Sequence, residues 1–269
     1  MQDNVILPQW LDNLIFDQLG AKYCRSNSDM TVIDWDKNDV LNYLGTYFPR
    51  SYAEAYCIFS EFFSKWPNWF CNKTEMSVFD FGCGTGGEII GLLDAINNYC
   101  PNIKTANIIA FDGNMHALRL YERIFKESKC YLRFEAKTRI IPLEIEDFYD
   151  LSVLLSVLHC GFDIIMTFKA ICEFVSIDRF EKNNPYTHII KYFVPKLKND
   201  GVILLDDVTT YNNVSQEWLP KMMDAGLSVI PDYQTIMRND GYNQTFMVQH
   251  SNKEIDVSKV AWRIIQKQN

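Results

Sequence analysis

The stretch "SVFDFGCGTGGEII", residues 77–90, constrains the fold of this chain more than any other. A short apolar run, typical of a buried strand, passes into a segment rich in glycine, and apolar residues at helical spacing follow at once. In parallel α/β sheets, a glycine-rich turn of this kind joins the first strand to a helix whose N-terminus faces a bound ligand. The stretch therefore predicts a strand, a ligand-binding turn and a helix, in that order.

Two ligand-binding signatures overlap in this turn. Gly82, Gly84 and Gly87 form the G-x-G-x-x-G pattern of a nicotinamide or flavin dinucleotide site. The acid-x-G-x-G-x-G pattern that opens a site for S-adenosylmethionine (SAM) is matched instead by Asp80, Gly82, Gly84 and Gly86. The two patterns indicate different chemistry, because the first kind of cofactor transfers a hydride and the second a methyl group.

The order of apolar segments predicts how the rest of the chain is arranged. From Met76 onward, short apolar runs alternate with amphipathic segments, which is typical of a parallel α/β sheet. We expect strands at 77–81, 107–111, 139–145, 162–168 and 201–208, with Asn114 capping the helix after the second. Three further candidate strands follow at 233–238, 243–250 and 259–265. A turn at 239–241 predicts a hairpin between the first two of these, and the last fits either a strand or a helix.

Residues 1–75 differ in texture from the rest of the chain. They are rich in aromatic residues and place apolar side chains every three or four positions, which indicates helices. Pro49 interrupts the longest helical run, so we expect a bend there between two helices. We therefore divide the chain into an N-terminal helical cap, residues 1–75, and a ligand-binding domain, residues 76–269.

Composition and charge argue against several classes of protein. No segment approaches the ~18 uninterrupted apolar residues of a membrane span, and residues 1–20 lack the basic region of a secretory signal. The eight cysteines are scattered without C-x-x-C pairs, which indicates a reduced, cytoplasmic protein without a metal site. The net charge of −8 argues against a broad surface for nucleic acid, which is bound mainly through clustered Lys and Arg.

Three features favour SAM over a dinucleotide. Asp80 comes two residues before the first glycine, where its carboxylate can meet the ammonium of an amino acid, a group that dinucleotides do not present there. After the third expected strand, Glu146 and Asp147 are placed to accept from an adenine amino group, and Phe148 to pack on the ring. The third feature is the hairpin ending, which departs from the six parallel strands of a dinucleotide domain. Asp112, at the end of the second strand, suits the ribose of either ligand.

Residues 76–210 resemble the class I SAM-dependent methyltransferases. The first motif of that family is similar to "VFDFGCGTGG", its second-strand acid to "IIAFDGN", the segment beside adenine to "PLEIEDF" and the strand beside the acceptor to "FDIIMTFKAICEF". The resemblance implies a Rossmann-like, seven-stranded α/β sheet and SAM as the cofactor. The cofactor-binding residues that we take from these motifs are Asp80, Gly82, Gly84, Gly86, Asp112, Asn114, Glu146, Asp147, Phe148 and Phe168.

A narrower likeness lies ahead of this region, in "YLGTYFPRSYAEAYCIFSEF". It is similar to the Y-x-x-x-R-x-P-x-x-Y-A segment of the mitochondrial small-ribosomal-subunit methyltransferase-like family. The positions that match are Tyr43, Pro49, Tyr52 and Ala53, whereas Tyr47 stands where that pattern has its arginine. The metal-binding cysteine cluster of that family is missing from the sequence, so we do not carry over its ribosomal partner.

Methyl transfer to an acceptor asks the protein mainly for alignment and for exclusion of water, because it is an in-line displacement at a sulfonium. An acid near the acceptor can take its proton, and we expect Glu173 or Asp207 to do so, since both follow strands on the acceptor side. We also expect Arg50 and Tyr52, beside Pro49, to close over the cofactor, with Arg50 or a tyrosine hydroxyl meeting its carboxylate.

The acceptor stays open at this point. The acidic balance and the aromatic N-terminal cap favour a small molecule or a limited protein surface over RNA, and nothing indicates a membrane partner or an oligomeric state. A nicotinamide-type oxidoreductase and a SAM-binding protein without catalytic activity are the competing functions.

Overall fold

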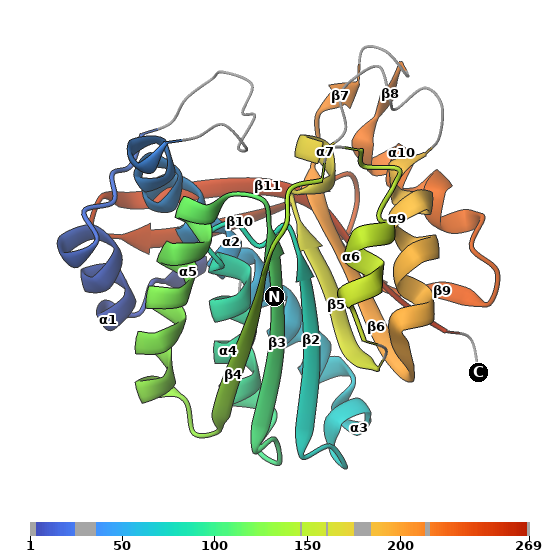
Figure 1. Cartoon of the computed structure of the whole chain (residues 1–269), viewed down its shortest axis with the longest axis horizontal. Helices are drawn as coiled ribbons and strands as arrows, with labels where there is room; N and C mark the ends of the chain where they lie inside the picture. The colour runs from blue at the N-terminus through green and yellow to red at the C-terminus, as the bar shows by residue number, and fades with distance from the viewer. Residues whose placement is uncertain are drawn as a thin grey trace.

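The computed structural model describes residues 4–24, 36–145, 147–159, 161–174, 184–212 and 216–267, with the backbone alone at 173, 174 and 212. Figure 1 shows a central sheet with helices against both of its faces. One apolar layer packs beneath α2 (Lys37–Lys65), α4 (Gly87–Tyr99) and α5 (Met115–Ser128). The other packs beneath α6 (Ser152–Val157), α9 (Pro185–Phe193) and α10 (Leu219–Ser228).

Five strands pair in parallel in the order β4-β3-β2-β5-β6. Their bounds are β2 (Glu75–Phe81), β3 (Thr105–Asp112), β4 (Glu135–Pro142), β5 (Phe162–Phe168) and β6 (Leu197–Val208). The alternation of strand and helix expected from the sequence is confirmed. β4 lies earlier than expected, because it pairs in register with all of β3 and ends at Pro142, which has no N–H to continue the ladder.

Antiparallel strands from the C-terminal part of the chain complete the sheet. β11 (Lys253–Lys267) pairs with β6, so the last segment is a strand and not a helix. β10 (Gln244–His250) pairs with the first part of β11, and β9 (Tyr233–Arg238) with its last part. β1 (Asn4–Ile6) adds a parallel strand beside β10, which gives the sheet nine strands where the resemblance implied seven.

The prediction of a hairpin between residues 233–238 and 243–250 is wrong, because β9 and β10 each pair with β11 and not with one another. Asn239 accounts for this arrangement. Its side-chain Oδ1 accepts from the Trp262 N–H at 2.9 Å and from Arg263 Nη1 at 2.7 Å. The turn between β9 and β10 is therefore attached to the middle of β11, and the two strands lie end to end along that strand.

A single helix, α2, runs through Pro49. It is 29 residues long, and the Asp36 carboxylate at its N-cap accepts from the N–H groups of Asn38 and Asp39 in a capping box. The expected division into two helices at Pro49 is wrong. A proline leaves one helical carbonyl without its N–H partner, but the helix continues because its long apolar face is buried against the rest of the molecule.

Two glycines of α4 bring this helix close to α2. A Cβ atom at Gly87 would collide with the Phe48 carbonyl, and one at Gly91 with the Tyr52 carbonyl. The backbones of the two helices can approach this closely because neither glycine carries a side chain. The glycine-rich turn that begins α4 is thereby held against the N-terminal helix.

Short elements and caps complete the fold. The Asn114 side chain accepts from the N–H groups of His116 and Ala117, which confirms that residue as the cap of α5. The remaining elements are α1 (Gln9–Asp12), the π-helical η1 (Asn13–Gln18), α3 (Pro67–Phe70), η3 (Lys129–Tyr131), α7 (Ile171–Phe174), η4 (Val194–Lys196), and the paired strands β7 (Tyr211–Asn212) and β8 (Glu217–Trp218).

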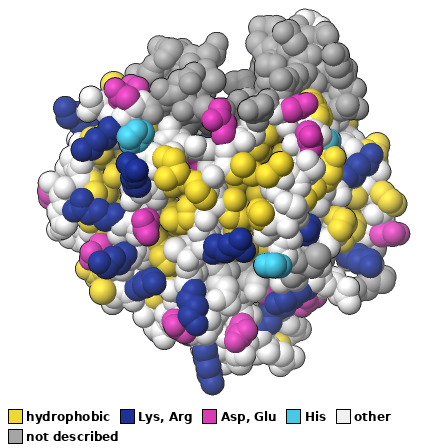
Figure 2. All heavy atoms as spheres, viewed as in Figure 1, with side chains coloured by type: hydrophobic (Ala, Val, Ile, Leu, Met, Phe, Trp, Pro, Cys, Tyr) yellow, Lys and Arg dark blue, Asp and Glu magenta, His cyan; other side chains and the backbone are white. Residues whose placement is uncertain are grey.

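The surface carries both signs of charge. Figure 2 shows apolar side chains gathered in the middle of one face, with Lys and Arg side chains scattered around them and Asp and Glu side chains in between. Among the described helices, none combines the length and the apolar character needed to cross a membrane.

Candidate active site

The turn between β2 and α4 has a backbone shape that favours glycine. Gly82, Gly84 and Gly86 have φ angles of +77°, +48° and +81°, a region that other residues rarely adopt. A Cβ at Gly86 would also run into the Tyr121 ring, and one at Gly84 would lie 3.2 Å from the Tyr43 hydroxyl. The three glycines therefore shape a largely buried turn at the end of β2, with Tyr43 of α2 beside it.

Asp112, the last residue of β3, fastens this turn. Its Oδ2 accepts from the Gly84 N–H at 2.8 Å, and its Oδ1 accepts from the Asn114 N–H at 2.7 Å. Burial raises the pKa of Asp112, and the bonds from main-chain N–H groups oppose that rise. Asp112 thus organises the glycine turn, and its expected contact with a ribose stays a prediction.

Asp80 lies beneath the turn, and neither of its carboxyl oxygens accepts a hydrogen bond from an N–H group or hydroxyl of the described residues; the Glu88 carboxyl lies within hydrogen-bonding reach. Its side chain is fully buried at the end of β2. Burial, followed by the nearby charge of Glu88, raises the pKa of Asp80 well above its usual range. Burial also raises the pKa of Glu88, in the first turn of α4, to about 8. These two acids therefore share an environment that disfavours their charged forms.

A second group of buried charges lies at the ends of β5 and β6. Lys169 follows β5 with a φ angle of +55°, and its N–H donates to the Asp206 carbonyl at 2.8 Å. The Lys169 Nζ donates to Glu54 Oε2 of α2 at 2.7 Å. Burial lowers the pKa of Lys169, but the charges of Glu54 and Asp206 outweigh burial and raise it overall. Burial, then the charge of Glu54, raises the pKa of Asp206.

The two groups form one cluster, because the charge of Glu88 acts on Lys169 and on Asp206. We call it the buried carboxylate cluster; its acids, all at most 4% exposed, are Glu54, Asp80, Glu88 and Asp206. Four acids surround one ammonium, so the cluster either keeps protons or needs an added cation. Within this cluster, Glu54 Oε1 and both carboxyl oxygens of Asp80 and of Asp206 are buried and accept no hydrogen bond from an N–H group or hydroxyl of the described chain.

The strand order decides the kind of fold that carries this site. The spatial strand order β4-β3-β2-β5-β6 is that of a doubly wound sheet. In such sheets, ligands bind at the carboxyl ends of the strands. Beyond β6 the next strand in the sheet is β11, which runs antiparallel to it, and β10 comes after β11. A dinucleotide domain has a parallel strand in the position of β11. The chain has the class I methyltransferase fold. The glycine turn occupies the ligand-binding end of its first core strand.

No protein-family model and no curated sequence matches this chain. Solved structures of methyltransferases are similar to it. Precorrin-6y C5,15-methyltransferase from Geobacter metallireducens is 13% identical over 81% of this chain and 89% of its own, with a TM-score of 0.45. Magnesium protoporphyrin IX methyltransferase from Synechocystis PCC 6803, with bound SAM, is 9% identical over 97% and 95%, with a TM-score of 0.47. An rRNA methyltransferase from Streptomyces viridochromogenes is 12% identical over 78% and 83%, with a TM-score of 0.44. At such values, the fold assignment depends on this chain's own strand order.

The two predicted acceptor-side acids of the methyltransferase fold lie apart from the buried carboxylate cluster or outside the description. Asp207 accepts from the Tyr186 hydroxyl at 2.9 Å and from the Val208 N–H at 2.8 Å. Successive residues of β6 point to opposite faces, so Asp206 joins the cluster and Asp207 faces α9. The backbone of Glu173 belongs to α7, but its side chain lies outside the described residues.

Arg50 and Tyr52, the predicted closing residues, are engaged with other partners. Arg50 is buried and forms an ion pair with Asp256 of β11, with a nitrogen–oxygen distance of 2.6 Å. The Tyr52 hydroxyl donates to Asp94 Oδ2 of α4 at 2.7 Å. The structure therefore does not bring either residue to the glycine turn, because α2 continues straight through Pro49 as one helix and faces both side chains elsewhere. Tyr43, one of the aromatic residues near the expected bend, takes that place.

The predicted adenine segment follows β4. Glu146 lies outside the described residues. Asp147 is exposed, and its Oδ1 accepts from the Tyr149 N–H at 3.0 Å. Phe148 is buried and contacts the ring of His188, with the ring centres 5.7 Å apart. Phe168, at the end of β5, is buried in the core layer beneath α2 and α4. Contact of these residues with a cofactor stays a prediction.

Sequence reasoning predicted Asp207 in place of its neighbour Asp206, and it missed three further members of the cluster: Glu54, Glu88 and Lys169. For each of these three, the neighbouring residues in the sequence give a sign of burial or of a place near the ligand. Glu54 and Glu88 are isolated acids within otherwise apolar or small helical stretches, "SYAEAYCIF" and "GGEIIGLL", where the burial of the helix face also buries the acid. Lys169 comes directly after an apolar strand, at the carboxyl edge where ligands bind.

Proposed function

We propose that this protein is a SAM-dependent methyltransferase that acts on a small-molecule acceptor. The observation that carries the proposal is Asp80, a fully buried acid next to the glycine turn that has another acid, Glu88, beside it and accepts no hydrogen bond from an N–H group or hydroxyl of the described chain. An amino-acid ammonium provides the positive charge and the donors that such an acid lacks. SAM presents that group together with an adenosine, whereas a nicotinamide dinucleotide does not.

When bound, SAM supplies an electrophilic methyl group on a sulfonium. The residues of this chain bind and orient it. We assign Gly84 and its neighbours to main-chain contact, Asp80 to the ammonium and Asp112 to the ribose hydroxyls. Tyr43 stacks on Tyr47 with ring centres 5.0 Å apart, and we assign this pair to the exclusion of water from the turn.

The second part of the proposal concerns the methyl acceptor and the acid that takes its proton. The net charge of −8 and the interspersed charges in Figure 2 support a small molecule over RNA, and an RNA or protein acceptor is the alternative. Glu173 stays the proposed acid for taking a proton from the acceptor, since both oxygens of Asp207 already accept bonds from Tyr186 and Val208. The cytoplasmic location expected from the scattered cysteines belongs to the same proposal.

Calorimetric titration tests the cofactor directly. The purified protein is titrated with S-adenosylhomocysteine, SAM and NAD in separate experiments. We expect saturable binding of the two sulfur compounds and none of NAD. Binding of NAD alone would replace the proposed function with a dinucleotide-dependent one.

Replacing Gly84 with Val will weaken binding of S-adenosylhomocysteine by about 100-fold or more, roughly 3 kcal/mol. A valine is strained at a φ angle of +48°, and its side chain occupies the space beside Tyr43 where the ligand lies against the main chain. The matched control is Gly241→Val, because Gly241 has a φ angle of +66° and open space around a Cβ. Circular dichroism confirms that both variants fold. Full affinity in Gly84→Val would show that the ligand site lies elsewhere.

A further inference from the structure

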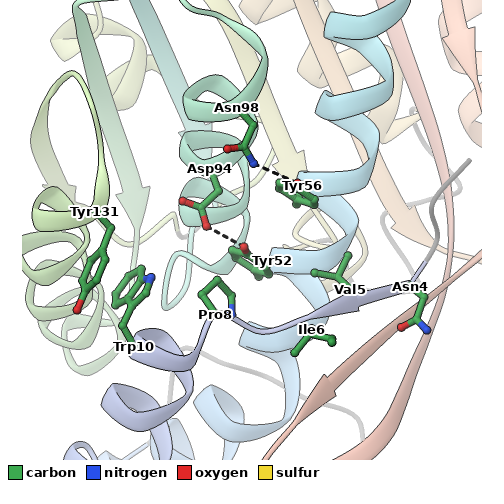
Figure 3. A pocket seen from close by; sticks show the side chains of 10 residues that line it. All are labelled: Asn4, Val5, Ile6, Pro8, Trp10, Tyr52, Tyr56, Asp94, Asn98 and Tyr131. Atoms are coloured by element: carbon green, nitrogen blue, oxygen red, sulfur yellow. Dashed lines mark hydrogen bonds between the residues drawn. The ribbon is translucent and has the colours of Figure 1, made fainter.

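A cavity lies between the N-terminal segment, α2 and α4 (Figure 3). Its volume is about 640 Å³, within the range that holds a small organic ligand. Asp94 of α4 lines it, two turns beyond Gly87 and therefore about 10 Å along the helix axis from the glycine turn. The cavity is separate from the candidate active site.

Two pairs of aromatic rings form its walls. Trp10 and Tyr131 stack with ring centres 4.4 Å apart and an angle of 11° between the planes. Tyr52 and Tyr56 of α2 are nearly parallel, at 6.1 Å and 4°. Figure 3 shows the first pair on one side of Asp94 and the second pair on the other. The faces of such rings carry partial negative charge and attract cations.

Two hydrogen bonds link polar side chains of the cavity and leave acceptors on two of them. Asp94 Oδ2 accepts from the Tyr52 hydroxyl at 2.7 Å, and the Asn98 side-chain N–H donates to the Tyr56 hydroxyl at 3.2 Å. These bonds leave Asp94 Oδ1 and the Asn98 side-chain carbonyl without a partner in the described parts of the chain. The described lining contains the Asp94 carboxylate and no Lys or Arg. The cavity thus presents one negative charge, free acceptors and ring faces.

We propose that this cavity binds a small organic cation that ends in a guanidinium or amidinium group. A planar cation of this kind donates parallel hydrogen bonds to a carboxylate while its flat faces lie against aromatic rings. Asp94 and Asn98 accept those bonds, and the cation's flat faces lie between the Tyr56 ring and the outer face of the stacked Trp10–Tyr131 pair. The site is independent of the proposed methyl transfer.

Calorimetric titration with benzamidine, an aromatic amidinium, tests the proposal at pH 8. Burial raises the pKa of Asp94 only to about 6, so its carboxylate is charged at that pH. We expect saturable binding of benzamidine and none of benzamide, which has the same shape but no charge. Asp94→Asn will weaken binding about 10-fold to 100-fold, because the amide keeps an acceptor for Tyr52 but loses the charge. Tyr131→Ala, which removes a ring that is 52% exposed, will weaken it about fivefold.

Asp17→Asn is the matched control, since Asp17 is exposed in η1 and its replacement changes the net charge equally. This variant will bind benzamidine like the original protein. Equal binding of benzamide, an unchanged affinity in Asp94→Asn, or an equal loss in Asp17→Asn would each overturn the proposal.

Discussion

Replacing Lys169 with Met will lower the free energy of unfolding by about 3–5 kcal/mol, the usual effect of removing one partner of a buried ion pair. The Lys169 ammonium lies 2.7 Å from Glu54 Oε2, and the Glu54 side chain is fully buried. Without the ammonium, Glu54 and Asp206 stay buried with no positive charge beside them, and they must take up protons or unfold. Urea denaturation at pH 8, followed by far-UV circular dichroism, measures the loss.

Three further variants separate the missing charge from the missing side chain. Lys169→Arg keeps the charge and will lose less stability than Lys169→Met. The double variant with Glu54→Gln will recover part of the loss, because the unpaired carboxylate is gone. Lys137→Met breaks an ion pair with Glu135 in which both side chains are more than half exposed, and it will change stability by less than about 0.5 kcal/mol. A Lys169→Met protein as stable as the Lys137→Met protein would show that the buried pair has no energetic role.

Replacing Glu88 with Gln will flatten the dependence of stability on pH. The pKa of Glu88 is about 8 in the folded protein, against 4.5 when the side chain is free, so the folded state holds a proton that the unfolded state releases between these values. The original protein therefore loses stability as the pH rises from about 4.5 to about 8. Without this titration, the loss between pH 5 and pH 8 will shrink by roughly 2–4 kcal/mol. Thermal and urea unfolding at both pH values measure it.

The slope will shrink and not vanish, because burial also raises the pKa values of Asp80 and Asp206 and these groups act in the same direction. Glu122→Gln is the control, since Glu122 is exposed on α5 and will leave the slope unchanged. If Glu88→Gln keeps the full slope, the proton is held by other members of the buried carboxylate cluster.

The sequence predicted the parallel sheet well, because each core strand is a continuous apolar run bounded by a polar or glycine-rich segment. It failed where pairing depends on distant residues. The turn at 239–241 has the composition of a hairpin, yet Asn239 bonds to Trp262 and Arg263 and directs the strands on either side of it onto β11. Pro49 likewise indicated a break, and the burial of α2 maintained the helix.

The sequence could predict the parts of the candidate site that depend on short motifs, and it could not predict contacts between residues far apart along the chain. The glycine turn was predicted from the spacing of its glycines, and Asp112 from its place at the end of the second expected strand; the two meet through the Gly84 N–H. The partners of Arg50 could not be predicted, because Asp256 lies about two hundred residues further along the chain. The same holds for Glu54 and Lys169, which lie 115 residues apart and meet only because α2 packs beside the end of β5.

The strand β1 has a consequence for how this molecule is made. Asn4, Val5 and Ile6 pair with Met247, Val248 and Gln249, so this strand waits for a partner that is synthesised more than two hundred residues later. Contacts between such distant residues slow folding, and a waiting strand exposes its hydrogen-bonding edge to other chains. β11 in turn joins β6, β9 and β10. During translation the five parallel strands can therefore associate early, while the sheet edge formed by β1, β10 and β11 closes only after residue 260 has left the ribosome.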